Sequence, residues 1–198
     1  MVGGLPDPFI CICTMPTPTV ALVIPLFNDA KSIQACLRSI EVRTTYPDYR
    51  LIVVDDGSTD GGAALLKQFP KVQVIRQARR GCAAAVNAGI AAAPGCDIVR
   101  LHADVVIDTP GWLERLVEVA YADEVTGVVG ARLVYPDGRI HSEGRSVITG
   151  LGMHPQHCDR RAFLPDGAPG KVQEVDTVPG ALLYCRRRVL DQVGGFDE

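Results

Sequence analysis

Apolar runs and amphipathic stretches alternate along the first two thirds of the chain. Runs in which β-branched and aliphatic residues predominate predict strands at 20–26, 51–54, 72–75 and 98–101. Apolar residues at helical spacing predict helices around 33–40, 65–66, 82–93 and 110–120. This repeated strand–helix order predicts an α/β fold with a mainly parallel sheet.

The pattern changes after Thr126. Residues 128–135 and the turn Pro136-Asp137-Gly138 predict the first strand and the turn of a β-hairpin. Residues 141–171 are rich in Gly, Pro, His and Arg and are too long for a simple connector, so we expect a binding loop there. A further strand is expected over 175–184, followed by a short basic helix.

The composition is that of one ordinary globular domain. The chain has 198 residues, of which 47% are hydrophobic and 22% charged, and this excludes a disordered chain, a coiled coil and a small disulfide scaffold. The net charge of −3 argues against a nucleic-acid-binding protein, because such proteins usually carry an excess of basic residues. We expect residues 1–19 to form a poorly ordered leader and residues 20–198 to form the domain.

The cysteines and the N-terminal run bear on the compartment. Seven cysteines without a CxxC pair favour a reducing compartment, and hence a cytoplasmic protein. Cys11-x-Cys13 and the segment His154 to Cys158 leave metal binding open as an alternative. Residues 8–28 carry no charge, but their prolines argue against a transmembrane helix.

Polar clusters follow three predicted strands, at 25–29, 55–56 and 102–104. Ligands of open α/β sheets bind at the carboxyl ends of the strands, so we expect these clusters to form one site. Phe27 can contact a nucleobase or ribose, and a carboxylate can accept a hydrogen bond from uracil N3–H or from a ribose hydroxyl. Asp104 can hold Mg²⁺ or Mn²⁺ against a diphosphate. Taken singly, the aspartate pair is also typical of a turn with a helix cap, and the histidine of a structural residue.

A basic run that could bind an anion precedes the alanine-rich helix. Arg79-Arg80-Gly81 places guanidinium groups beside the unpaired N–H groups of a helix start, which suits a phosphate. The alternative is a solvated basic edge. The chain has neither GxxxxGK[ST] nor GxGxxG, so a P-loop and a dinucleotide site are not supported.

In their order and spacing, these segments resemble family 2 glycosyltransferases with the GT-A fold. The resembling segments are Val23-Ile24-Pro25-Leu26-Phe27-Asn28, Val53 to Asp60, Arg80 to Gly89, Leu101-His102-Ala103-Asp104, Gly130 to Ile140 and Gly194-Gly195-Phe196-Asp197-Glu198. The resemblance implies a Rossmann-like sheet with helices on both faces and a smaller antiparallel part on the acceptor side. It further implies a nucleotide-sugar-binding half over 20–125 and a partial acceptor half over 126–198.

The resemblance also implies an activity: transfer of a sugar from a UDP-, GDP- or dTDP-type donor to a hydroxyl of a saccharide or lipid-linked acceptor, with inversion and metal assistance. The substrate-binding residues that it implies are Pro25, Phe27, Asn28, Asp55, Asp56, Arg80, Gly81, Asn87, His102 and Asp104. Pro25, Phe27 and Asp56 would border the base and ribose, and Arg80 and Gly81 would lie near the diphosphate. Asp104, with His102 as a second ligand, would bind Mn²⁺ or Mg²⁺.

The sequence departs from the family pattern at three places. Ala30 replaces an acidic residue, and His102 replaces the first aspartate of Asp-x-Asp, where imidazole suits Mn²⁺ better than Mg²⁺. The catalytic base is expected beyond Glu198, so no catalytic residue is assigned. These departures support a second hypothesis, a transferase-like module that binds nucleotide-sugar or glycan without turnover. A sugar nucleotidyltransferase is disfavoured, because no Gly-rich basic loop follows the first strand.

One basic segment bears on membrane contact. Arg186-Arg187-Arg188 could meet an anionic lipid-linked acceptor or the inner face of a membrane. The alternative is the solvated start of a helix.

Overall fold

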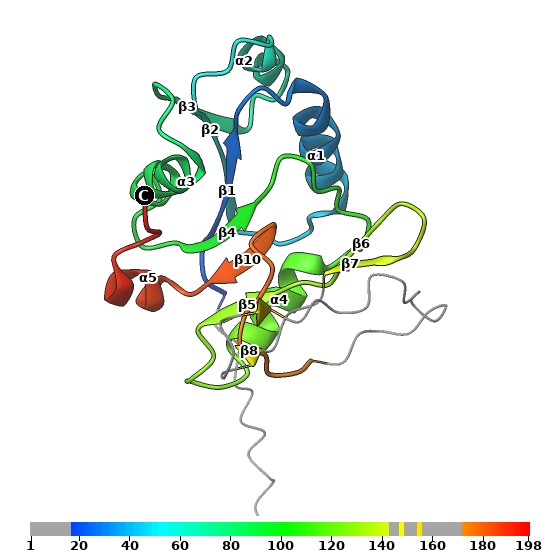
Figure 1. The fold of residues 1–198 in the computed structure, drawn as a ribbon, viewed down its shortest axis with the longest axis vertical. Coiled ribbons are helices and arrows are strands. Elements are labelled where there is room, and N and C mark those ends of the chain that lie inside the picture. The colour runs from blue at the N-terminus through cyan, green and yellow to red at the C-terminus, as the bar shows by residue number, and fades with distance from the viewer. Residues whose placement is uncertain (1–16, 143–146, 149–153, 156–171) are drawn as a thin grey trace, which may run out of the picture.

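A computed structural model describes residues 17–142, 147–148, 154–155 and 172–198. A six-stranded sheet runs through its centre in the order β3-β2-β1-β4-β10-β5 (Figure 1). Its strands are β1 (Val20–Leu26), β2 (Tyr49–Asp55), β3 (Val72–Arg76), β4 (Asp97–Leu101), β5 (Val128–Gly130) and β10 (Leu182–Cys185). The first four are parallel, and β10 runs antiparallel to both of its neighbours. The predicted α/β, GT-A-like fold is confirmed.

Helices cover both faces of the sheet, as expected (Figure 1). On one face lie α1 (Ala30–Arg43), α4 (Trp112–Ala120) and the short turns α2 (Gly62–Leu65) and η1 (Leu66–Gln68). On the other lie α3 (Cys82–Ala91) and α5 (Arg187–Val193). The strand β1 is central to both layers, because its alternate residues point to opposite faces.

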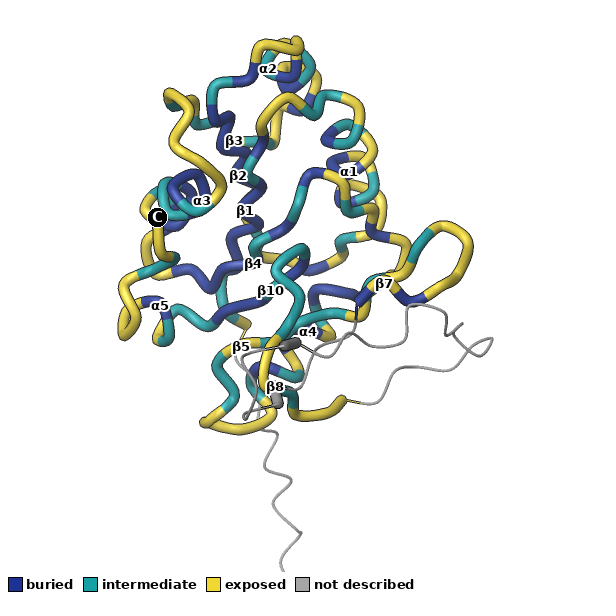
Figure 2. The backbone as a smooth tube through the Cα atoms, in the orientation of Figure 1, coloured by how far each residue is buried: buried dark blue, intermediate teal, exposed yellow. Residues whose placement is uncertain are grey.

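The core follows from that alternation. Leu22 and Ile24 of β1 are fully buried against α1 and α4, while Val23 is fully buried on the α3 face (Figure 2). Helix α3 packs closely on β1, since a Cβ on Gly89 would lie 2.3 Å from Val23 Cγ1. A helix built from alanine and glycine therefore fits where bulkier residues would not.

The amino-terminal end of β4 is tied by a buried carboxylate. Asp97 Oδ2 accepts hydrogen bonds from the hydroxyls of Tyr121 at 2.8 Å and Tyr184 at 2.5 Å, and its Oδ1 accepts one from Arg187 N–H at 2.7 Å. These contacts join α4, β10 and α5 at the edge of the sheet opposite the predicted site. A buried carboxylate is stable here because each of its oxygens has a hydrogen-bond donor.

The predicted hairpin differs from the structure in its strands. Residues 128–135 form two strands rather than one: β5 pairs with β10 in the main sheet, and β6 (Leu133–Val134) pairs with β7 (Ile140–Ser142). A second antiparallel pair joins β8 (Val147–Ile148) to β9 (His154–Pro155). Only the end of the predicted 175–184 strand, as β10, enters the sheet.

Parts of the other expectations lie outside the described residues. Residues 1–16 of the expected leader, most of the 141–171 loop, Cys11-x-Cys13 and His157-Cys158 are among them. The expected halves at 20–125 and 126–198 stay a prediction. In the described part of the chain, no helix is both long and apolar enough to cross a membrane.

Candidate functional site

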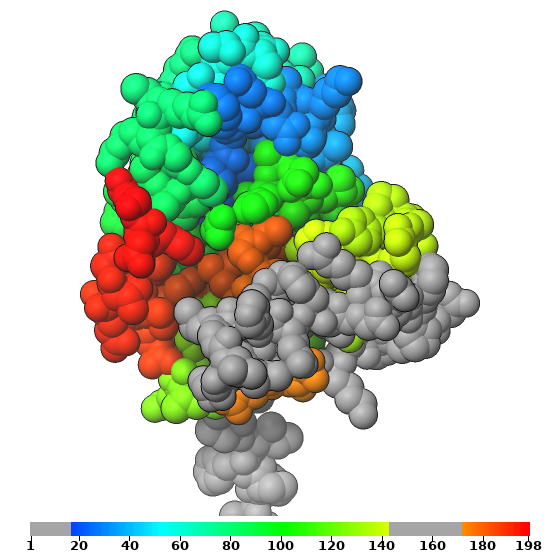
Figure 3. Space-filling view, viewed as in Figure 1, coloured from blue at the N-terminus to red at the C-terminus, as the bar shows by residue number. Residues whose placement is uncertain are grey.

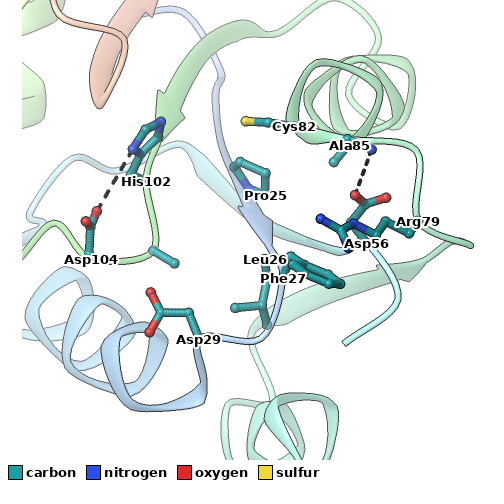
Figure 4. A pocket seen from close by; sticks show the side chains of 12 residues that line it. Pro25, Leu26, Phe27, Asp29, Asp56, Arg79, Cys82, Ala85, His102 and Asp104 are labelled. Atoms are coloured by element: carbon teal, nitrogen blue, oxygen red, sulfur yellow. Dashed lines mark hydrogen bonds and ion pairs between the residues drawn. The ribbon is translucent and has the colours of Figure 1, made fainter. Parts of the chain in front are cut away.

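A pocket of about 330 Å³ lies at the carboxyl ends of the central strands (Figure 4). The pocket opens between the ends of β1 and β4. These two strands are neighbours in the sheet, although β2 follows β1 in the chain, so the strand order reverses here and this is the topological switch point of the fold. Its walls come from the ends of β1 and β4, from Asp56 after β2, and from the loop and first turn of α3. The predicted site residues that line it are Pro25, Phe27, Asp56, Gly81, His102 and Asp104.

Asp56 is a buried carboxylate held by several donors. Its Oδ1 accepts hydrogen bonds from Gln77 Nε2 and Arg80 N–H, both at 2.8 Å, and its Oδ2 accepts one from Gly81 N–H at 2.9 Å. Burial alone would raise the pKa of Asp56, but these bonds, with a smaller contribution from Arg79, lower it below the usual value. The group is therefore an ionised acceptor at the pocket wall near neutral pH.

Phe27 and Arg79 form a stacked pair beside Asp56. The guanidinium carbon of Arg79 lies 4.0 Å from the centroid of the Phe27 ring, within the range of a cation–π contact. Phe27 remains 37% exposed. This side of the pocket thus offers an aromatic surface, a cation and a carboxylate together.

Two predicted site residues hold loops rather than line the pocket. Asn28 has φ of 50°, its N–H donates to Ser58 Oγ at 3.0 Å, and its Oδ1 accepts from Thr59 N–H at 2.8 Å. Asp55 is fully buried, and its Oδ1 accepts from Ser58 N–H at 2.8 Å. Asn28 therefore joins the loop after β1 to the loop after β2, while Asp55 holds the second loop from the end of its own strand, and together they fix Phe27 and Asp56 relative to each other.

Arg80 and Asn87 contact the C-terminal segment 194–198, which lies beside α3 (Figure 3). The Asn87 amide accepts from Phe196 N–H at 2.9 Å and donates to Phe196 O at 2.8 Å. Arg80 Nη2 lies 2.6 Å from Glu198 Oε2 in an ion pair whose partners are both substantially exposed. The Asn87 side chain thus holds the backbone of this segment, while the backbone N–H of Arg80 donates to Asp56 at the pocket wall.

His102 and Asp104 lie on the opposite side of the pocket from Asp56 (Figure 4). His102 Nδ1 is 4.0 Å from Asp104 Oδ1, and His102 Nε2 is 3.0 Å from Arg100 Nη2. Burial lowers the pKa of His102, and the nearby Arg100 guanidinium lowers it further, while Asp104 opposes both. The Asp104 side chain is 69% exposed, so its carboxylate is available to a ligand in the pocket.

Three residues at the site are not among those predicted: Cys82 and Ala85 line the pocket, and Gln77 holds Asp56. Asp29, from the predicted 25–29 cluster, also lines the pocket, and so does Arg79. Arg79 stands in the basic run before α3, so the anion-site argument already pointed to it. Gln77 gives no sequence signal, because its role depends on β3 lying beside β2.

Similar sequences are found among known proteins. Residues 21–193 match the family model described as "Glycosyl transferase family 2". The glycosyltransferase AglE of Haloferax volcanii is 32% identical over 92% of this chain and 57% of its own length. The N-acetylglucosaminyl-diphospho-decaprenol L-rhamnosyltransferase of Mycobacterium tuberculosis is 28% identical over 92% of this chain and 66% of its own.

A solved structure shares the fold. The mannosyltransferase PcManGT from Pyrobaculum calidifontis, in complex with GDP-Man and Mn²⁺, aligns with a TM-score of 0.67 at 22% identity, over 92% of this chain and 48% of that one. The chain spans about two thirds or less of the length of each of these three proteins.

Proposed function

The chain belongs to glycosyl transferase family 2, and from this premise we propose that it transfers a sugar from a nucleotide-diphosphate-sugar donor to an acceptor hydroxyl. The donor binds in the pocket at the ends of β1 and β4. The observation that carries the proposal is that the ionised Asp56, the first turn of α3 and the exposed Asp104 converge on this one pocket.

The side of the pocket formed by Asp56, Phe27 and Arg79 suits a nucleoside. Asp56 Oδ2 accepts one hydrogen bond within the protein and can accept another from a base N–H or a ribose hydroxyl. The exposed part of the Phe27 ring offers a surface to the base or ribose. A UDP-, GDP- or dTDP-type donor is therefore proposed, with the base at this side.

The diphosphate would lie between the start of α3 and the end of β4. Gly81, with φ of 99°, is the N-cap residue of α3, and the pocket reaches the first turn of this helix at Cys82 and Ala85. Backbone N–H groups at a helix start favour an anion. This places the leaving nucleoside diphosphate where the protein stabilises negative charge. Inversion at the sugar carbon is proposed separately, from the membership of family 2.

The two residues predicted to bind a divalent cation differ in their fit. Asp104 fits, because it is an exposed carboxylate facing the pocket, and Mg²⁺ and Mn²⁺ are commonly held by one or two carboxylates together with substrate phosphates. His102 does not fit as a second ligand, because Arg100 occupies its Nε2. A cation bound at Asp104 supplies a Lewis acid that neutralises the diphosphate.

The acceptor and the compartment are proposed on separate grounds. A saccharide or lipid-linked acceptor is proposed because one relative is named for a decaprenol-linked substrate. A reducing, cytoplasmic location is in keeping with the free thiols of Cys36, Cys82, Cys96 and Cys185. The Arg186-Arg187-Arg188 run gives no support to membrane contact, because all three guanidinium groups donate to backbone carbonyls of this chain.

Calorimetric titration tests the proposal. The protein is titrated with UDP-, GDP- and dTDP-sugars, with and without Mn²⁺, beside an Asp56→Asn variant and an Asp137→Asn control at an exposed turn away from the pocket. We expect one donor to bind to the wild type and the control and to bind much more weakly to Asp56→Asn. Failure of a folded chain to bind any of these donors would overturn the proposal. Binding without sugar transfer or donor hydrolysis would favour the alternative of a module that binds without turnover.

A further inference from the structure

Arg100 carries a positive charge within strand β4. Its guanidinium lies between β4, α3 and the C-terminal segment, with Nη2 at 3.0 Å from His102 Nε2 and at 3.5 Å from Cys82 Sγ. Its guanidinium carbon is 5.6 Å from the centroid of the Phe196 ring. A Cβ on Gly180 would lie 2.5 Å from Arg100 Nη1, so a glycine leaves this place for the guanidinium.

No carboxylate among the described residues forms an ion pair with Arg100. Its Nε is buried without a hydrogen-bond partner in that part of the chain. A guanidinium so placed keeps its charge, since arginine is not deprotonated in proteins. Among the described residues, the nitrogen acceptor that it contacts is the imidazole of His102.

This contact determines where the His102 proton lies. A guanidinium has five N–H donors and no acceptor, so in the Arg100–His102 bond the imidazole Nε2 must accept. An accepting Nε2 carries no proton, and a neutral imidazole then carries its single proton on Nδ1.

The Nδ1 atom points toward Asp104, and both residues line the pocket (Figure 4). Its distance of 4.0 Å from Asp104 Oδ1 is too long for a hydrogen bond, so the Nδ1–H can reach an acceptor that enters the pocket. Neither nitrogen can then bind a metal: Nε2 uses its lone pair for Arg100, and Nδ1 holds the proton.

We propose that Arg100 fixes His102 with its proton on Nδ1, so that His102 donates a hydrogen bond to a phosphate oxygen of the donor instead of coordinating a cation. In this arrangement Arg100 is a positioning residue, and its charge polarises the imidazole toward the anion. The identity of the anion rests on the proposed function, whereas the position of the proton does not.

Nitrogen NMR tests the position of the proton directly. Long-range proton–nitrogen correlation on ¹⁵N-labelled protein distinguishes a protonated from an unprotonated ring nitrogen, and the His102 signals are those missing from a His102→Gln variant. We expect the unprotonated nitrogen to be Nε2 in the wild type and in an Arg115→Met control, whose arginine pairs with Glu118 on the surface. In Arg100→Met we expect the preference for Nδ1–H to be lost. An unprotonated Nδ1 in the wild type, or an unchanged pattern in Arg100→Met, would overturn the proposal.

Two His102 variants test the donated bond. The Asn side chain places an amide near the position of Nδ1, whereas that of Gln places one near Nε2. In EDTA, we expect His102→Gln to weaken binding of UDP, GDP or dTDP, whichever binds, by roughly tenfold or more, as for loss of a hydrogen bond to a charged group. His102→Asn should retain most of the wild-type affinity, since it keeps a donor facing the pocket. Equal losses in the two variants would contradict the assignment to Nδ1.

Manganese binding separates this proposal from metal ligation by His102. With nucleotide present, we expect Asp104→Asn to weaken Mn²⁺ binding and His102→Gln to leave it within about twofold of the wild type, because only a ligand contributes a bond to the ion. A loss in His102→Gln as large as in Asp104→Asn would overturn the proposal. If no nucleotide binds to any variant, the proposed function fails while the NMR result still decides the position of the proton.

Discussion

Asp56→Asn keeps the size of a buried side chain and removes its charge. The amide has one acceptor oxygen, so it can keep the bonds from Gln77 and Arg80 while its NH₂ group faces the Gly81 N–H. The two retained bonds fall from the range of charged acceptors, about 1.5–3 kcal/mol each, to about 1 kcal/mol each. An unsatisfied buried N–H costs about 1–3 kcal/mol more. The expected loss of unfolding free energy is therefore about 2–7 kcal/mol near neutral pH.

The same substitution has a pH dependence of known sign. The folded-state pKa of Asp56 is lowered, whereas an aspartate in the unfolded chain titrates near about 4. The stability due to ionised Asp56 is thus fully present above about pH 4 and is lost as the pH falls through the lower folded-state value. The difference between wild type and Asp56→Asn should therefore shrink below about pH 4.

Urea denaturation of both proteins at about pH 7 and about pH 3 measures these differences. Asp137→Asn is the control, because its carboxylate is exposed and accepts from Arg139, and such surface changes usually lie within about 0.5 kcal/mol. A loss in Asp56→Asn of less than about 0.5 kcal/mol, or one that is the same at both pH values, would refute the reasoning.

Three further substitutions test the packing around the pocket. Gly89→Ala should lower the unfolding free energy by about 1–3 kcal/mol in urea denaturation, because its Cβ would overlap a valine methyl of β1, and an unchanged value would contradict this close approach. Tyr184→Phe should cost about 1–3 kcal/mol in the same assay through the lost bond to the buried Asp97, with the m-value unchanged. Asn87→Ala should speed hydrogen exchange at the Phe196 N–H while leaving exchange in β1 unchanged, and equal exchange at Phe196 would show that the amide does not hold this segment.

The strands with continuous apolar runs could be predicted from the sequence, while the pairing of the later strands could not. The predicted strand at 20–26 has the bounds of β1, because it is buried on both faces and its residues are almost all aliphatic. By contrast, residues 128–135 divide between two sheets, and of 175–184 only the last residues pair with β4. Apolar character marks these segments as extended, but the partner of each is set by tertiary packing.

The same distinction holds for the site. The clusters at the ends of β1, β2 and β4 meet because parallel neighbouring strands end at one edge of the sheet, which the sequence pattern implied. Asn28 and Asn87 instead contact Thr59 and Phe196, which are distant in sequence and carry no shared motif. Arg100 was indistinguishable from any charged residue within a strand, since its role depends on a contact with His102 at the end of that strand.

Hydrogen exchange with and without bound donor tests the central claim most directly. The protein is exchanged alone and with saturating UDP-, GDP- or dTDP-sugar, with Mn²⁺ present, and the protected peptides are mapped by mass spectrometry. We expect the donor that binds to slow exchange in the segments 25–29, 79–85 and 102–104, each of which contributes residues that line the pocket, and to leave β3 and α5 unchanged. Protection elsewhere with none in these three segments would contradict a donor site at the ends of β1 and β4.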